Sequence, residues 1–491
     1  MISPVTINRL ATGVPGLDTV LGGGLPEFSF NLIAGAPGSG KTTLAHQIMF
    51  ALASPERPAL YFTVLGEPAL KMLRYQQQFE FFDSDAITTS IRFINLSEEA
   101  SGGDLDRVMA RISAEVQAAG PGLVFVDSFR SVMMAGASEG SSTAVLQGFV
   151  QQLGVQMTSW QATTFLIGEY FSETDVNPVF TVADGIIWLR QSLERNSMVR
   201  KLEIMKMRGQ ATLPGLHTFR ITGAGITVFA PASLVIRPRE VISAPRSRLS
   251  MGVPGLDEML GGGLPDGYSL LVAGPSGSGK SILAATFLSE GARQGERGVI
   301  ASFEQHPNRM RNRQLARLLE AGQVVLVDSR APDLSIDEIV LLLVTEIRRV
   351  GARRVVIDSL SGFELSLAPT FREDFRESMA RLVTALSVEG VTALMTSELE
   401  DRYTDLRFSP YGTAFMTDAI IVQRYIEVDS RLRRMLAVVK VRGSTHSDAL
   451  REFSIDDSGI VLGEMLTDQE GLLGGRPTRK VGAAPAVEHD V

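Results

Sequence analysis

The sequence contains no cysteine, and only five of its 491 residues are histidine. Disulfide bonds, thiolate zinc sites and cysteine nucleophiles are therefore excluded, and a histidine-based metal centre is not expected. A chain without cysteine also fits a reducing compartment, so we expect a cytoplasmic protein.

Long apolar runs are missing as well. The longest, near Ile339–Val344, is far too short to cross a bilayer. The first residues show neither the basic start nor the apolar stretch of a signal peptide. We therefore expect no association with a membrane.

Positive charge is in deficit, because 47 lysines and arginines stand against 55 aspartates and glutamates, for a net charge of −8. A strongly basic protein that coats nucleic acid is therefore excluded, although a local basic patch is not. The 44% hydrophobic and 21% charged residues are typical of folded proteins, which excludes a largely disordered or fibrous chain.

A long internal repeat organises the chain. The segment Leu10–Pro26 recurs as Leu249–Pro265, with 13 of 17 positions identical at an offset of 239 residues. This period is too long for a solenoid and indicates a tandem duplication of a whole domain. We predict domains at residues 1–235 and 236–465, followed by a Gly-, Ala- and Pro-rich disordered tail at 466–491.

Each half alternates short apolar runs with helical segments. Continuous apolar strands between helices predict an α/β fold, with a mostly parallel sheet covered by helices on both faces. The strands are expected at 30–34, 59–64, 123–126 and 163–167, and at 270–273, 299–303, 355–357 and 392–395. The alternating segments Lys201–Met207 and Met435–Val441 are expected to add strands at the sheet edge.

A phosphate-binding motif occurs once in each half, between an expected strand and an expected helix. Gly35–Thr42 and Gly274–Ser281 both match G-x-x-x-x-G-K-[ST]. Backbone N–H groups and the helix N-terminus would surround the phosphates of ATP, and the lysine would reach the β- and γ-phosphates. A glycine-rich turn with a chance lysine is the alternative, and two copies in matched context argue against it. The residues expected to bind nucleotide are Gly35, Pro37, Gly38, Ser39, Gly40, Lys41, Thr42 and Thr43 in the first half, and Gly274, Ser276, Gly277, Ser278, Gly279, Lys280, Ser281 and Ile282 in the second.

An aspartate ends a later apolar strand in each half, at Asp127 and Asp358. A carboxylate at this place can hold Mg²⁺ through its water, while Thr42 and Ser281 offer hydroxyl groups to the ion. The alternative is an ordinary aspartate at a strand end. Beside a phosphate loop we favour two magnesium sites.

Hydrolysis needs a carboxylate that polarises the attacking water. Glu304 follows a strand of the second half directly, whereas in the first half only Glu67 is present, two positions later. We therefore expect Glu304 to be the base of the second site. Glu67 is either the base of the first site or a solvent-facing loop carboxylate.

Two cations recur near the end of each domain, as Lys206 with Arg208 and as Lys440 with Arg442. Alternation along a strand places each pair on one face. Cations from a neighbouring subunit could stabilise the γ-phosphate as arginine fingers do. A solvated basic edge is the alternative.

Together, the paired G-V-P-G-L-D segments, the two phosphate loops, the D-S strand ends and the K-x-R-G motifs resemble the KaiC family of RecA/DnaB-type ATPases over about residues 5–465. The resemblance implies two RecA-like domains per chain, six chains in a double ring, and ATP at the subunit interfaces. It also implies that Lys206 and Arg208, and Lys440 and Arg442, act in the neighbour's sites.

Two departures from the family pattern stand out. The clock members carry adjacent glutamates where this chain has Leu65-Gly66 in one domain and Glu304-Gln305 in the other. They also phosphorylate a Ser-Thr pair that aligns here with Ala414-Phe415, which has no hydroxyl group. Other hydroxyl groups nearby are Ser409, Thr413 and Thr417.

Three functions remain open at this point. The first is a hexameric ATPase that works as a signalling or timing module with regulatory protein partners, and the second is a Ser/Thr autokinase. The third is a RecA-like DNA-binding ATPase, for which the best feature is the arginines at 309–317 with Arg348, Arg349, Arg353 and Arg354. Overall acidity and the lack of interleaved aromatics favour solvated helix faces, so nucleic acid is not expected as a partner.

Overall fold

Contacts divide the chain into two compact units, Met1–Pro231 and Ala232–Val491. The predicted boundary near residue 235 falls between the described parts of these units and stays a prediction. The computed structural model describes residues 7–64, 69–101, 104–136, 143–171, 177–194, 197–231, 247–303, 312–327, 333–372, 375–399, 415–428, 430–456, 459–465, 469–470 and 478–479.

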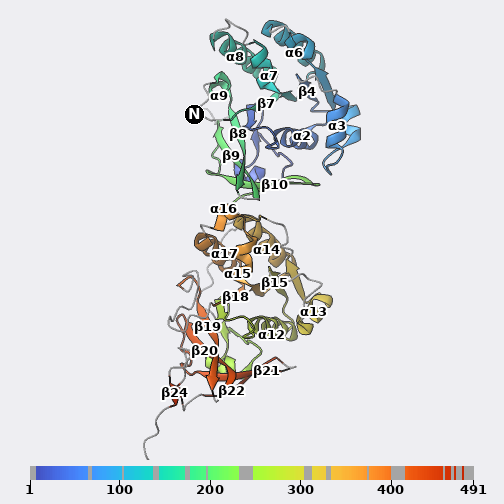
Figure 1. The fold of residues 1–491 in the computed structure, drawn as a ribbon. Coiled ribbons are helices and arrows are strands. Elements are labelled where there is room, and N and C mark those ends of the chain that lie inside the picture. The colour runs from blue at the N-terminus through green and yellow to red at the C-terminus, as the bar shows by residue number, and fades with distance from the viewer. Residues whose placement is uncertain are drawn as a thin grey trace, which may run out of the picture. The chain divides into compact units, whose positions relative to one another are not determined.

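The first unit is built on a nine-stranded sheet in the order β11-β10-β9-β8-β3-β7-β6-β4-β5. Figure 1 labels β4, β7, β8, β9 and β10 of this sheet. Strands β8, β3, β7, β6, β4 and β5 are mutually parallel, and β9 to β11 continue the sheet antiparallel. The strands are β3 (Phe30–Gly35), β4 (Ala59–Thr63), β5 (Ile91–Asn95), β6 (Leu123–Asp127), β7 (Thr163–Glu169), β8 (Gly185–Glu194), β9 (Ser197–Met207), β10 (His217–Thr222) and β11 (Gly225–Phe229). A short pair, β1 (Arg9–Leu10) with β2 (Leu25–Pro26), precedes the sheet.

Helices connect the strands of the first unit. They are α1 (Leu17–Leu21), α2 (Lys41–Leu52), α3 (Ala69–Gln76), α4 (Ser84–Thr89), α5 (Ser97–Ser101), α6 (Leu105–Ala119), α7 (Phe129–Gly136), α8 (Thr143–Ser159) and α9 (Pro178–Val182). Local sequence sets their ends. For α6, the Asp104 side chain accepts hydrogen bonds from two backbone N–H groups of the first turn, and Gly120 ends the helix in the left-handed region.

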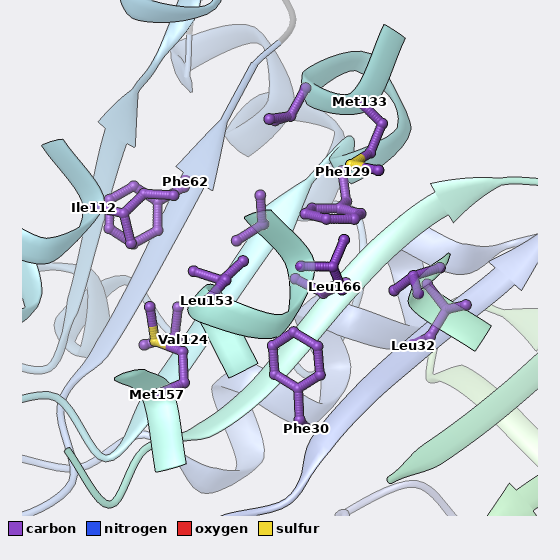
Figure 2. Close-up of a cluster of buried hydrophobic side chains, with 14 of the residues drawn as sticks. Phe30, Leu32, Phe62, Ile112, Val124, Phe129, Met133, Leu153, Met157 and Leu166 are labelled. Atoms are coloured by element: carbon purple, nitrogen blue, oxygen red, sulfur yellow. The ribbon is translucent and has the colours of Figure 1, made fainter. Parts of the chain in front are cut away.

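The main core of the first unit lies between the sheet and helices α6, α7 and α8. Figure 2 shows Phe30 and Leu32 of β3 converging with Leu166 of β7 and with Phe129 of α7. Residue 33 of β3 points to the opposite face, where α2 packs against the same strand. Both faces of the parallel strands are therefore covered, as the continuous apolar runs predict.

The second unit repeats this plan, with the strand order β16-β15-β17-β18-β14-β19-β20-β21-β22. Along β14, Leu271 packs against one core and Leu270 against the core on the other face. The strands are β14 (Ser269–Gly274), β15 (Gly298–Ser302), β16 (Val324–Val327), β17 (Arg354–Asp358), β18 (Thr392–Glu398), β19 (Ala419–Val428), β20 (Arg431–Val441), β21 (Arg451–Asp456) and β22 (Gly459–Met465), with β12 (Arg248–Leu249) paired to β13 (Leu264–Pro265). The helices are α11 (Pro254–Met259), α12 (Lys280–Arg293), α13 (Arg313–Glu320), α14 (Ile336–Val350), α15 (Leu360–Ser366), α16 (Pro369–Arg372) and α17 (Phe375–Glu389).

The predicted fold class is confirmed, since each unit is a mostly parallel sheet with helices on both faces. One detail of the prediction is wrong. The segments Lys201–Met207 and Met435–Val441 belong to β9 and β20, which lie inside their sheets because β10 with β11, and β21 with β22, extend each sheet further. Of the predicted tail, the structure describes only two short strands, β23 (Gln469–Glu470) and β24 (Thr478–Arg479), which pair antiparallel.

Within the described ranges, no helix is long and apolar enough to cross a membrane.

Candidate nucleotide sites

The first phosphate loop connects β3 to α2 at the carboxyl edge of the sheet. Gly40 adopts a φ of 102° where α2 begins. A Cβ atom on Gly35 would lie 2.2 Å from the backbone oxygen of Leu189 on β8. A side chain at position 35 would therefore collide with the neighbouring strand, so glycine is required there. Pro37 and Gly38 are exposed on the loop, and Ser39 is buried beneath it.

Lys41 crosses the loop, and its ammonium group donates a hydrogen bond of 2.9 Å to the backbone oxygen of Ala36. Burial lowers the pKa of Lys41, while the carboxylates of Glu169 and Asp127 raise it. A pocket opens around the lysine. It is lined by Gly38, Gly40, Lys41, Thr42, Thr43, Thr63, Met72, Asp127, Ser128, Ile167, Gly168, Glu169 and Ile221.

The predicted magnesium residues of the first half meet in this pocket. Thr42 Oγ1 donates to Asp127 Oδ2 at 2.9 Å, and the hydroxyl of Tyr61 donates to the same oxygen at 2.8 Å. Burial raises the pKa of Asp127, and the hydrogen bonds from Tyr61 and Thr42 and the charge of Lys41 oppose this rise. One hydroxyl and one carboxylate fit Mg²⁺, a hard cation that keeps several waters and binds substrate phosphates.

The second phosphate loop repeats this geometry between β14 and α12. Lys280 Nζ donates to the backbone oxygens of Gly274 and Pro275, at 2.8 Å each. Ser278 is buried, and its hydroxyl donates to Gln423 Oε1 at 3.1 Å. Asp358 ends β17, and its Oδ1 accepts a hydrogen bond of 2.5 Å from Thr396 Oγ1. The remaining predicted residues of this loop are Ser276, Gly277, Gly279, Ser281 and Ile282, of which Ser276, Gly277 and Ser281 are exposed.

In neither unit do the described residues contain a cluster of three or more acidic or histidine side chains that could hold a metal alone. A magnesium ion at these sites would therefore depend on nucleotide phosphates for part of its coordination, which is the usual arrangement.

The predicted cations lie at the opposite edge of the first sheet from the phosphate loop. Lys206 Nζ donates to the backbone oxygen of Thr181 at 3.0 Å, and Arg208 forms an ion pair of 3.1 Å with Asp184. In the register of β8, Gly185 pairs with Met207 and Leu189 pairs with Gly35. Along β8, the position beside the cations and the position beside the phosphate loop are therefore four residues apart, which is about 13 Å.

The second unit shows the same separation. Lys440 Nζ donates to the backbone oxygen of Thr417 at 2.5 Å, and Arg442 pairs with Asp418 at 3.1 Å. Partial burial lowers the pKa of both Lys206 and Lys440, and the adjacent arginine lowers it further. Neither unit brings its own cations to its own phosphate loop.

Both predicted water-polarising residues, Glu67 and Glu304, lie outside the described residues, as do Ser409, Thr413 and Ala414. Phe415 is 56% exposed, with the guanidinium of Arg376 4.8 Å from its ring centre. Thr417 is buried, at 2% exposure. Its side chain therefore lies away from solvent.

The arginines considered for DNA are largely paired with acidic side chains. Arg348 binds Glu389, and Arg349 binds Glu346, at 2.6 Å each. Arg354 is buried at 1% exposure and forms a 2.6 Å ion pair with Glu296, and Arg353 binds the same glutamate at 2.6 Å. Arg309 and Arg311 lie outside the described residues. Arg348, Arg349, Arg353 and Arg354 thus form intramolecular ion pairs, whereas Arg313 and Arg317 are exposed on α13.

The sequence analysis missed Glu169, which lines the first pocket, and Tyr61, which donates a hydrogen bond to Asp127. Glu169 ends β7, the strand between the loop strand β3 and β6, and its charge raises the pKa of Lys41 and Asp127. The repeat held a signal for it, because Glu398 ends the equivalent strand and pairs with Gly274 as Glu169 pairs with Gly35. Tyr61 gave no such signal, since it reads as one more apolar residue of a buried strand.

The two α/β units, each with a phosphate loop beside a strand-end aspartate, define a tandem RecA-like P-loop ATPase. The model of the KaiC ATPase family matches residues 10–233 and 249–467. The chain therefore belongs to the KaiC ATPase family, which confirms the predicted relationship.

Several curated relatives match nearly the whole chain at low identity. The circadian clock oscillator protein KaiC of Rippkaea orientalis is 26% identical over 487 residues, covering 96% of this chain and 92% of that protein. The circadian clock oscillator protein KaiC 1 of a Synechocystis species is 26% identical over 491 residues, with 96% and 92% covered. KaiC of Synechococcus elongatus is 25% identical over 493 residues, with the same coverage.

Proposed function

We propose that this chain forms a cytoplasmic homohexamer whose two tiers bind ATP with Mg²⁺, and that its nucleotide state controls the binding of regulatory protein partners. The observation that carries the proposal is the separation of loop and cations. Within each unit, Lys206 with Arg208, or Lys440 with Arg442, lies at the edge of the sheet opposite to the loop. A complete site therefore needs two chains.

The described residues supply most parts of a hydrolytic site. Lys41 and Lys280 would bind the β- and γ-phosphates, and the hydroxyls of Thr42 and Ser281 would hold the magnesium ion with Asp127 and Asp358. Bound magnesium would neutralise charge that develops on the phosphate oxygens.

Glu304 is proposed to take a proton from the attacking water in the second site. The water oxygen forms a bond to the γ-phosphorus, and the bond from that phosphorus to the bridging oxygen breaks, with its electron pair left on ADP. In the first site, Leu65-Gly66 stands where the carboxylate is expected. That tier would mainly bind ATP and hold the ring together.

Assembly is the first test of the proposal. Native mass spectrometry of the full chain should show a homohexamer that ATP and Mg²⁺ stabilise, because a ligand bound only to the ring shifts the equilibrium toward it. The same spectra should count up to 12 nucleotides per ring, two for each of about six chains. A chain that stays monomeric with saturating ATP and Mg²⁺, and still hydrolyses ATP normally, would contradict the proposal.

Autokinase activity is the second candidate function, favoured only by the family relationship. Ala414 and Phe415 carry no hydroxyl group, and Thr417 is buried. We therefore expect no stable phosphate on residues 410–418 after incubation with ATP, as phosphopeptide mapping would show. Stoichiometric phosphate on Thr413 or Thr417 would instead show that the acceptor has moved.

A further inference from the structure

The carboxylate of Asp127 is held from two sides through one oxygen. Thr42 and Tyr61 both donate to Oδ2, at 2.9 Å and 2.8 Å. Tyr61 is fully buried, and its hydroxyl donates to this carboxylate away from solvent.

Packing fixes the position of this phenol. Tyr61 pairs with Phe125 across the sheet, and the two rings stack at 5.8 Å with an angle of 17°. On the other side, the ring of His46 of α2 lies 4.7 Å from the tyrosine ring. Burial lowers the pKa of His46 to about 4, so its ring is neutral at pH 7. The tyrosine ring is thus packed against side chains of β6 and α2.

The second unit holds its aspartate from the other flanking strand. Thr396 of β18 is fully buried and donates to Asp358 at 2.5 Å. The position equivalent to Tyr61 is Ile300. Tyr61 lies two residues before Thr63, which pairs with Asp127, and Ile300 lies two residues before Ser302, which pairs with Asp358. The position equivalent to Thr396 is Ile167, the direct partner of Asp127 on β7.

On the two strands that flank the aspartate, one unit therefore has a hydroxyl group where the other has an isoleucine, and the reverse holds for the second position. The first has its hydroxyl on β4 and isoleucine on β7, and the second has isoleucine on β15 and its hydroxyl on β18. Each unit has one donor on a strand that flanks the aspartate, although the strand that supplies it differs between the units. This exchange is what a requirement for one buried donor to the aspartate would produce.

We propose that Tyr61 and Thr396 are positioning residues that orient Asp127 and Asp358 for the magnesium ion of ATP. The inference rests on the proposed function. The Thr42 hydroxyl would bind the ion through an oxygen lone pair and can still donate its proton to Asp127, so it is shared between the ion and the carboxylate. Tyr61 is the donor dedicated to the buried carboxylate, and it keeps that carboxylate aimed at the ion.

The variant Tyr61→Phe removes one hydroxyl and keeps the stacked ring. The probe is a fluorescent, non-hydrolysable ATP analogue, N-methylanthraniloyl AMP-PNP, bound to full-length chain in which Lys280→Ala silences the second site. We expect the Mg²⁺ concentration for half-maximal tight binding to rise about tenfold, since hydrogen bonds to charged groups are strong. Binding of the analogue in EDTA should stay unchanged.

A rescue variant separates positioning from general stability. Adding Ile167→Thr to Tyr61→Phe places a hydroxyl where the second unit has Thr396. The Mg²⁺ concentration for half-maximal tight binding should then fall most of the way back to the wild-type value. The matched change Thr396→Val, measured in chain with Lys41→Ala, should raise the Mg²⁺ requirement of the second site by a similar factor.

Three results would overturn the inference. The first is an unchanged Mg²⁺ requirement in Tyr61→Phe and Thr396→Val, and the second is an equal loss of binding in EDTA, which would indicate a merely structural role. The third is a wild-type chain that does not bind the analogue at either site, and only this result would also overturn the proposed function.

Discussion

Glu304→Gln is expected to lower the ATPase activity of the full chain by about 10²-fold or more, because loss of a general base typically costs 10²–10⁴-fold. Glutamine has nearly the same shape but cannot accept the proton of the attacking water. Glu67→Gln should remove little activity, because Leu65-Gly66 leaves the expected place in the first domain without a carboxylate. Phosphate release at saturating ATP measures both.

Binding provides the control for this pair. Both variants should bind the fluorescent ATP analogue as the wild type does, since Lys41 with Thr42 and Lys280 with Ser281 are intact. The opposite pattern, with the larger loss in Glu67→Gln, would overturn the assignment. Gly66 would then have given the backbone the freedom to bring Glu67 to the water.

Mixing two inactive variants is expected to restore hydrolysis. Arg442→Ala should lower turnover in the second tier about 10³-fold or more, as loss of an arginine finger does, and Lys280→Ala should abolish ATP binding there. In rings mixed at equal amounts, about one interface in four combines an intact loop with an intact arginine from its neighbour. Activity should therefore return to about a quarter of the wild-type value.

The matched control is Arg348→Ala, which removes an exposed arginine of α14 that pairs with Glu389. This variant should keep wild-type turnover. Mixed rings that form, as mass spectrometry would show, yet stay inactive would contradict donation between subunits. The reason to expect donation is geometric, because Arg442 contacts Asp418 and the backbone oxygen of Phe415 at the edge remote from its own loop.

The sequence alone predicts those parts of the candidate site that depend on local spacing. A loop such as Gly35–Thr42 is set by its own glycines and by the strand and helix around it, and Asp127 is recognisable as the polar end of an apolar run. The parallel strands could be predicted because both their faces are buried. These features need no knowledge of distant contacts.

Residues whose role depends on a partner far along the chain were not predictable. Tyr61 meets Asp127 across 66 positions, and only the register of β4 with β6 brings them together. Likewise, alternation predicted the strand that carries Lys206 and suggested that it lies at the edge of the sheet. Strands β10 and β11 extend the sheet beyond it, so this strand is internal. The order of strands in a sheet is set by pairing between distant segments of the chain. The alternation of apolar and polar residues within one strand carries no information about that pairing.

Each domain has two different ends, because the phosphate loop lies at one edge of the sheet and the cations lie at the opposite edge. A two-fold dimer joins like surfaces, so it could not bring the loop edge of one subunit to the cation edge of another through a shared contact patch. Only a heterologous, head-to-tail contact does so, and such a contact repeats until it either closes or continues as a filament. Because every chain carries one domain of each kind, the two tiers of the proposed ring would have to close after the same number of subunits. A substitution that alters the rotation per subunit in one domain would then strain the ring formed by the other.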